Sequence, residues 1–224
     1  MGPRKTTTRE RLITTAAELF WRQGYAQTGV NEIIQQARAT SGSFYHFVPA
    51  KEDLLLAVVD HMSAKIQAEV FEAAATTTTD PIDRLFSILS AYRRYLVDND
   101  FVFASPLASL AAEVSENHPQ VRARLAEVVD GWASQIEDLL TDAAPRLPMD
   151  TDRGVLARFI VSAMEGAVLQ ARVSRSAVPF DATVTQLRTH FDHLREHVGL
   201  PEPTRLPARP TPRQVISAGD WKAW

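Results

Sequence analysis

The stretch TGVNEIIQQARATSGSFYHFVPAKEDL, residues 28–54, decides the fold of the N-terminal part of this chain. Its apolar residues between 30 and 37 recur with helical spacing, which predicts a short amphipathic helix with Thr28 as its N-cap. Only three residues then precede a second predicted helix over residues 41–47, and Thr40 is a favourable N-cap for it. Two short helices joined by so tight a turn indicate a helix-turn-helix motif.

A third short helix is predicted before this motif, over residues 9–23. Its apolar side chains recur at intervals of three and four residues. Thr7 and Glu10 have the spacing of a capping box at its start, and Gly24 predicts a Schellman ending. The N-terminal region is therefore expected to be a bundle of three short helices.

The last of these helices has the character of a recognition helix. The major groove of DNA is about 12 Å wide and admits one α-helix. Phe44 and Phe47 are three residues apart and are expected to pack inward. The outer surface is then left to small and polar residues, which allow a close approach to the groove floor: Ser41, Gly42, Ser43, Tyr45 and His46.

The remainder of the chain is helical by pattern, with no alternating strand or hairpin signal. The sequence predicts an all-α fold of about nine helices, with further helices near 51–75, 81–98, 106–115, 119–144, 152–176 and 181–198. We expect a helix-turn-helix domain over residues 1–50 and a helical ligand-binding and dimerisation domain over 51–200. Residues 201–224 hold five prolines in their first half and are expected to form an extended tail.

Charge is distributed unevenly between these regions. Residues 1–50 carry a net charge of +3, whereas residues 51–200 carry −8. A basic head on an acidic body favours a polyanionic partner for the head. The chain has no cysteine and no run of about 18 apolar residues, so neither disulfides nor a membrane span are expected, and we expect a cytoplasmic protein.

No catalytic motif is present: the sequence has no GxGxxG, P-loop, GxSxG or HExxH pattern. We therefore predict no catalytic residue, no cofactor and no enzyme activity. His190, His193 and His197 share one helix face and could hold a metal ion, but a polar stripe on a packing helix is the simpler interpretation, so no metal site is predicted.

Many spaced positions over about 50 residues resemble the TetR family of bacterial transcriptional regulators. The matching residues are Phe20, Gly24, Tyr25, Thr28, Ile33, Ala37, Thr40 to Phe47 and Lys51 to Leu54. The resemblance implies that Thr28 caps the second helix and contacts phosphate. It also implies that Ser41 and Ser43 face base edges, that Tyr45 and His46 bind phosphate or base edges, and that Lys51 binds phosphate. Thr40 and Gly42 belong to the same expected DNA-binding surface.

Two positions depart from the family pattern. Arg38 stands where many members have glycine, which predicts a turn that is not left-handed there. Ser41 stands where many members have lysine, so one phosphate contact is lost. Arg4, Lys5 and Arg9 could compensate as a basic arm.

The body is expected to bind a small, mostly apolar effector among its aromatic and polar core residues. The candidates are Phe86, Phe103, Trp132, Met164, Glu165 and Gln170. A buried carboxylate such as Glu165 needs a partner, which Arg158 or a ligand could supply. The small residues between 157 and 171 are implied by the resemblance to form a homodimer interface, although ordinary packing within one chain would also use them.

We therefore expect a DNA-binding transcriptional repressor that a small ligand releases from a palindromic operator. Alternatively, the ligand is a corepressor that strengthens DNA binding. A different class of function also remains: a helical small-molecule-binding or catalytic domain whose first three helices merely pack and do not bind DNA.

Overall fold

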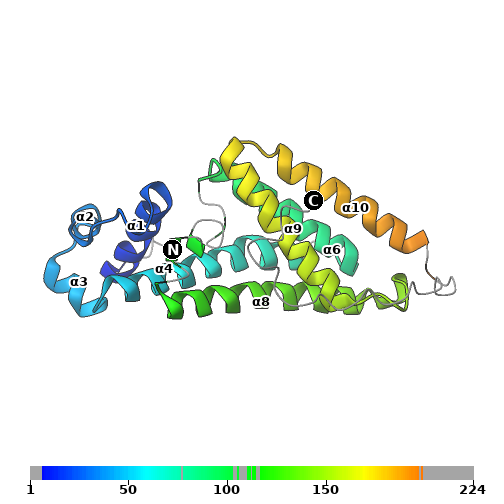
Figure 1. Cartoon of the computed structure of the whole chain (residues 1–224), viewed down its shortest axis with the longest axis horizontal. Helices are drawn as coiled ribbons and strands as arrows, with labels where there is room; N and C mark the ends of the chain where they lie inside the picture. The colour runs from blue at the N-terminus through cyan, green and yellow to red at the C-terminus, as the bar shows by residue number, and fades with distance from the viewer. Residues whose placement is uncertain are drawn as a thin grey trace, which may run out of the picture.

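The structure is a computed structural model that describes most of the chain between residues 7 and 198. The described residues are 7–76, 78–102, 105, 110, 111, 113, 114, 117–196 and 198. All regular elements among them are helical, which confirms the all-α prediction (Figure 1). The predicted tail over residues 201–224 and most of the predicted helix over 106–115 lie outside the described residues.

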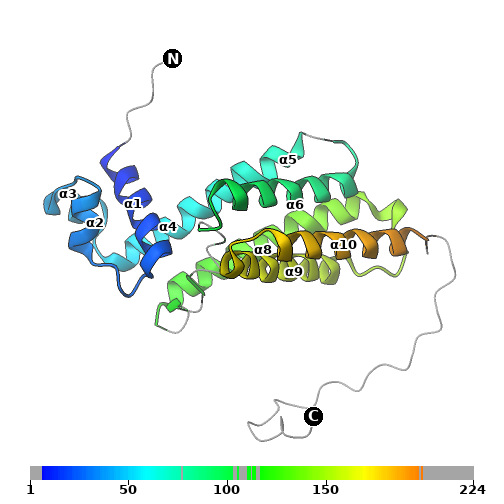
Figure 2. The same ribbon diagram turned by 90° about the horizontal axis from the view of Figure 1, so that it is seen from above.

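The first three helices gather at one end of the molecule (Figures 1 and 2). They are α1 (Thr8–Gln23), α2 (Val30–Gln36) and α3 (Ser41–Phe47). The capping box predicted at the start of α1 is present: the Glu10 N–H donates to Thr7 Oγ1 at 3.1 Å, and the Thr7 N–H donates to Glu10 Oε2 at 2.7 Å. We call this bundle the head.

A long helical segment leads from the head into the rest of the molecule. It consists of α4 (Lys51–Ile66), a π-helical stretch η1 (Gln67–Glu72) and a last short turn α5 (Ala73–Ala75). The predicted helix over 51–75 is thus continuous but widened near its end. At this point the Gln67 side-chain amide exchanges hydrogen bonds with Gln135, and Phe71 stacks on Trp132 with ring centroids 6.3 Å apart. Both contacts fix the widened turn against a neighbouring helix.

The other long helices pack with α4 into a bundle that we call the body. They are α6 (Pro81–Asp98), α8 (Pro119–Asp142), α9 (Arg153–Ser174) and α10 (Val178–Glu196), with a 3₁₀ turn η2 (Ala144–Arg146) after α8. Proline occupies the first position of α6 and of α8, where its missing N–H costs nothing. The side chains of Asp80 and Asp152 cap α6 and α9.

Helix α9 is central to the body because it packs against both α8 and α10. Leu156, Ile160, Val161 and Met164 are among its buried side chains. By length and composition alone, α9 is the one helix in the described part of the chain that is apolar enough to cross a membrane. Packing against α8 and α10 buries part of these apolar side chains.

Candidate nucleic-acid interface and effector site

The outer face of α3 is open to solvent and is the candidate nucleic-acid interface. Ser41, Gly42, Tyr45 and His46 are exposed, and the Tyr45 side chain is 58% exposed. The helix is fixed at its start by its predicted cap: Thr40 Oγ1 accepts the Ser43 N–H at 3.1 Å and donates to Ser43 Oγ at 3.0 Å. These residues form a contiguous polar surface at the N-terminal end of a helix, where the backbone amides favour an anion.

The packing of α3 differs from the prediction in one residue. Phe44 is fully buried, as expected, but Phe47 is 41% exposed. The inward partner of Phe44 is Val48, which is buried and lies four residues along the chain. The prediction for Phe47 is therefore wrong, because the inward stripe of this short helix follows the four-residue spacing and not the three-residue spacing.

The turn between α2 and α3 is left-handed at Arg38, where φ is +51°. The prediction that a non-glycine residue would avoid this conformation is thus wrong. The turn is held by hydrogen bonds from the Arg38 N–H to the Gln35 carbonyl (3.1 Å) and from the Ala39 N–H to the Ile34 carbonyl (3.0 Å). This Schellman-type ending satisfies the last carbonyls of α2 and offsets the cost of placing a side chain there.

Thr28 does not cap α2. The N-cap is Gly29, which has no side chain to accept a hydrogen bond. The Thr28 side chain is instead only 1% exposed, and its hydroxyl donates to the Gly24 carbonyl at 2.7 Å. The prediction of a cap is wrong, and a residue buried in this way positions the loop between α1 and α2 instead of presenting its hydroxyl to phosphate.

The turn after α1 is held by a residue from the body. Gly24 has a φ of +88°, and its N–H donates to the Phe20 carbonyl, so α1 ends at the predicted residue. The predicted Schellman motif is wrong, because Gly24 is the C-cap with a ψ of 157° and not a left-handed C′ residue, although the Tyr25 ring does contact Phe20 as expected. The next two N–H groups, of Tyr25 and Ala26, donate to the Glu113 carboxylate at 3.0 and 2.5 Å. A Cβ on Gly24 would lie 3.2 Å from both carboxylate oxygens of Glu113. We call this contact the Glu113 clamp.

Lys51 joins the same region. Its ammonium donates to the Tyr25 carbonyl at 2.6 Å and lies 4.1 Å from the centroid of the Tyr25 ring. The Tyr25 ring also meets His118 edge to face at 5.2 Å, and His118 Nδ1 lies 3.2 Å from a Glu52 oxygen. Partial burial lowers the pKa of Lys51. Lys51 thus points back to the turn after α1, and a phosphate contact would use its remaining N–H donors.

Inside the body, Glu165 is the candidate effector site. Its carboxyl group is almost fully buried, and Tyr92, itself fully buried, donates its hydroxyl to Glu165 Oε1 at 3.3 Å. Ser105 is also buried and hydrogen-bonds to this carboxyl group. Burial raises the pKa of Glu165 to about 7. None of the described residues donates a hydrogen bond to the second oxygen, Oε2.

Arg158 does not serve as the partner of Glu165. Its guanidinium donates to Asp130 at 2.9 Å on the outside of the body. Phe86, Trp132 and Met164 are buried, with Phe86 packed on Phe191 and beneath Arg188, and their part in an effector site stays a prediction. Phe103 lies outside the described residues. Gln170 is exposed and belongs to a different feature.

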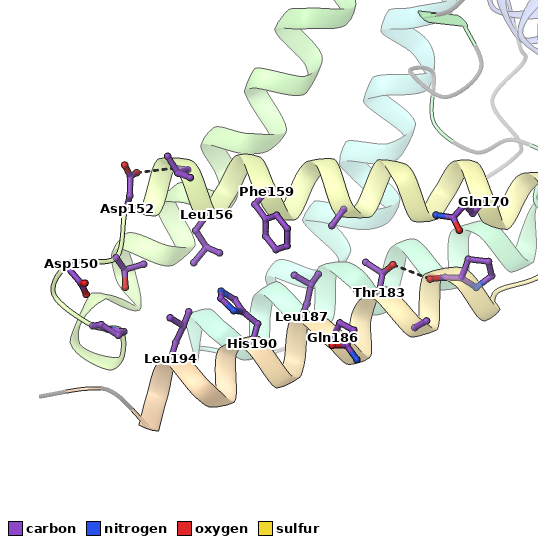
Figure 3. A pocket seen from close by; sticks show the side chains of 16 residues that line it. Asp150, Asp152, Leu156, Phe159, Gln170, Thr183, Gln186, Leu187, His190 and Leu194 are labelled. Carbon is purple, nitrogen blue, oxygen red and sulfur yellow. Dashed lines mark hydrogen bonds between the residues drawn. The ribbon is translucent and has the colours of Figure 1, made fainter. Parts of the chain in front are cut away.

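That feature is a groove of about 980 Å³ between α9 and α10 (Figure 3). Leu156 and Phe159 enter it from α9, and Leu187, His190 and Leu194 enter it from α10. The groove continues an exposed stripe along α9 whose members are spaced four and three residues apart. The stripe consists of Val155, Phe159, Ser162, Gly166, Leu169 and Val173.

The small residues of α9 divide between two faces. Ala157, Ala167 and Ala171 are buried within the chain, whereas Ser162 and Gly166 are exposed on the outer stripe. Packing within the chain is thus confirmed for the buried alanines, and a homodimer interface through Ser162 and Gly166 stays a prediction. For the histidines of α10, no group of three metal-ligating side chains occurs among the described residues, and His197 is not among them.

Sequence reasoning missed the Glu113 clamp and the contact of Glu165 with Tyr92. Glu113 lies 88 and 87 positions after the two residues whose N–H groups it accepts, and Glu165 lies 73 positions after Tyr92. No local pattern reports such a contact, because the two partners lie far apart in the sequence.

Comparison with known proteins identifies both parts of the chain. Residues 12–58 match the family model of bacterial regulatory proteins of the tetR family, and residues 81–187 match the tetracyclin repressor-like C-terminal domain. The chain is 31% identical over 188 residues to the uncharacterized HTH-type transcriptional regulator Rv0196 of Mycobacterium tuberculosis, covering 80% of this chain and 92% of that protein. It is 30% identical over 173 residues to the HTH-type transcriptional regulator LmrA of Bacillus subtilis, covering 76% and 89%.

A solved structure shows the same architecture. The regulatory protein TetR from Rhodobacter sphaeroides superposes with a TM-score of 0.74 at 26% identity, covering 83% of this chain and 98% of that one. The relatives are transcriptional regulators and not enzymes. The chain belongs to the TetR family of bacterial transcriptional regulators, and it is a DNA-binding regulator.

Proposed function

We propose that this regulator is a homodimeric repressor that a small, mostly apolar ligand releases from a palindromic operator. The observation that carries the DNA-binding part is the exposed polar face of α3, held by the Thr40 cap above a buried Phe44. Two such faces in a symmetric dimer would enter successive major grooves about 34–36 Å apart. In this proposal residues 1–50 form the DNA-binding domain and residues 51–200 form the effector-binding and dimerisation domain. The protein acts in the cytoplasm.

The exposed stripe of α9 supports the homodimer. Val155 and Val173, near the two ends of the stripe, are 65% and 80% exposed, and Phe159 lies between them. Residues of the stripe alternate at intervals of four and three, which is the spacing found where two helices pack together. The small Ser162 and Gly166 at the centre of the stripe would allow two copies of α9 to approach closely. Such an apolar stripe is unusual on the surface of a monomer.

Glu165 supports the proposal of a small-molecule effector and indicates which chemical groups that ligand carries. A buried carboxyl oxygen with no donor among the described residues costs free energy. A ligand with an apolar body and one polar group would fill the same region and supply the missing hydrogen bond, as a donor to the carboxylate or as an acceptor for the proton of the neutral acid. Tyr92 and Ser105 would hold the carboxyl group in place for it.

Operator binding can be tested by fluorescence anisotropy with the DNA upstream of the protein's own gene. We expect a salt-sensitive complex that Tyr45→Ala weakens while the melting temperature stays unchanged, since Tyr45 is exposed. Met149→Ala, at a fully exposed position in the body, is the matched control and should bind as the wild type does. A folded dimer that binds no palindrome in this region at low salt would refute the repressor and favour the helical binding or catalytic domain.

The dimer can be tested separately by sedimentation of Phe159→Glu. A charge within the stripe should yield a folded monomer, because it would be buried without a partner in the interface. Val97→Glu adds the same charge to an exposed apolar position on α6 and should leave the dimer intact. A dimer that persists in Phe159→Glu would place the interface elsewhere.

A further inference from the structure

A second cleft, of about 620 Å³, lies where the head meets the body. Trp21 and Arg22 from the last turn of α1 form one side of it. Arg172 and Arg175 from the end of α9 form the other, and Asp100 and Val102, just after α6, complete the lining. Three helices therefore end around this cleft, two from the body and one from the head.

The cleft carries an excess of positive charge. Its lining has three guanidinium groups and one carboxylate. The pKa of Arg172 is lowered, first by burial and then by the positive charge of Arg175. Guanidinium groups of like charge thus face each other in this cleft.

Two of these guanidinium groups keep N–H donors available. Arg22 is exposed and forms no side-chain hydrogen bond with the described residues. Arg175 uses Nη1 to donate to the Asp100 carbonyl at 2.8 Å, and its left-handed backbone at the end of α9 aims it toward this turn. Arg172 already connects the two parts, since its Nη2 donates to the Trp21 carbonyl at 3.0 Å. A planar guanidinium offers paired donors that match the oxygens of a phosphate or carboxylate group.

We propose that this cleft is a binding site for the oxyanion group of a small molecule, a phosphate or a carboxylate, held between Arg22 of the head and Arg175 of the body. The site is separate from both the α3 surface and Glu165. An anion bound there neutralises the facing guanidinium groups and ties the end of α1 to the end of α9. It thereby restricts how the head is oriented on the body.

The test is isothermal titration of the full-length protein with pyrophosphate and, separately, with citrate, each against sodium chloride of equal ionic strength. Pyrophosphate and citrate distinguish a phosphate site from a carboxylate site. Arg22→Gln and Arg175→Gln each remove one guanidinium, and Arg122→Gln removes an exposed arginine on α8 as the matched control. Since no DNA is present, the result does not depend on operator binding.

We expect saturable binding of one of the two anions to the wild type and to Arg122→Gln. Affinity should fall by about tenfold or more in both cleft variants, because each loses a charge-assisted hydrogen-bond pair. Heats equal to those of sodium chloride would overturn the proposal. So would an affinity that Arg22→Gln and Arg175→Gln leave unchanged, since the anion would then bind elsewhere.

Discussion

Replacing Glu165 by glutamine should remove a pH dependence of stability that this one carboxyl group creates. The pKa of Glu165 rises from 4.5 to about 7 on folding because its carboxyl group is buried. The folded protein therefore keeps a proton that the unfolded chain releases. Between these two pKa values the folded state binds more protons, so stability falls as the pH rises toward 7 and then levels off. A carboxylate in a salt bridge would give the opposite pH dependence, with stability that rises as the pH rises.

The size of the effect follows from the two pKa values. Linkage gives a loss of about 2 kcal/mol in the free energy of unfolding between pH 5.5 and pH 8. The measurement is urea unfolding of the wild type and of Glu165→Gln at both pH values and at one protein concentration, since a dimer's stability depends on concentration. Histidines and other titrating groups contribute equally to both proteins, so the difference between the two pH dependences isolates Glu165.

Glu72→Gln provides the control, because Glu72 is exposed and forms no side-chain hydrogen bond with the described residues. It should show the same pH dependence as the wild type. The free energy of unfolding of Glu165→Gln could instead fall by as much as that of the wild type between pH 5.5 and pH 8. That result would mean that the Glu165 carboxyl group is ionised in the folded protein. The assignment of Glu165 as a neutral, buried hydrogen-bond partner would then be incorrect.

Three further substitutions test the head by urea unfolding. Gly24→Ala should lower the free energy of unfolding by about 1–3 kcal/mol, because φ is +88° and the new Cβ would crowd the Glu113 carboxylate. Gly29→Ala is the control and should change stability little, since nothing lies within 4 Å of its new Cβ and φ is −83°. Arg38→Gly should stabilise by up to about 1 kcal/mol by relieving the left-handed backbone, and a loss of stability would contradict the strain described there. Thr40→Ala should cost about 1 kcal/mol through loss of the α3 cap and should also weaken operator binding; unchanged stability would show that the cap is dispensable.

The helices of the head could be predicted closely from the sequence, because their ends are specified locally. The capping box at Thr7 and Glu10 and the cap at Thr40 were both confirmed. Helix α3 spans the predicted residues 41–47, and α6 spans the predicted 81–98. In each case a capping side chain or a proline lies next to the residue at which the helix begins.

The errors have a common physical cause: contacts with residues three to five positions away outweighed the preference of the single residue. Arg38 adopts a left-handed conformation because the Schellman-type hydrogen bonds outweigh its preference. Thr28 has the right chemistry for a cap but is drawn into the loop by the Gly24 carbonyl. Phe47 lies just beyond the inward stripe that Phe44 and Val48 form. Each outcome depends on which of several competing local contacts forms, and the preference of a single residue does not decide that.

The candidate effector site was predicted only in part. Glu165 was identified because a carboxyl group stands within an apolar helix, and that signal is local. Its partners Tyr92 and Ser105 come from other segments, so composition could not select them. The aromatic candidates were chosen by residue type. Phe86 and Trp132 are buried in this structure, each packed on another aromatic ring, and their contact with an effector stays a prediction.

The Glu113 clamp limits how freely such a regulator can be divided or recombined. The loop that supports α2 and α3 borrows its hydrogen-bond acceptor from a residue almost ninety positions downstream. A fragment ending after residue 50 would leave the Tyr25 and Ala26 amides facing water and would lose the ammonium of Lys51 as well. Grafting this head onto a foreign body would succeed only if the new host supplied an acid at the equivalent place. Swapped chimeras therefore need to inherit position 113 together with the first fifty residues.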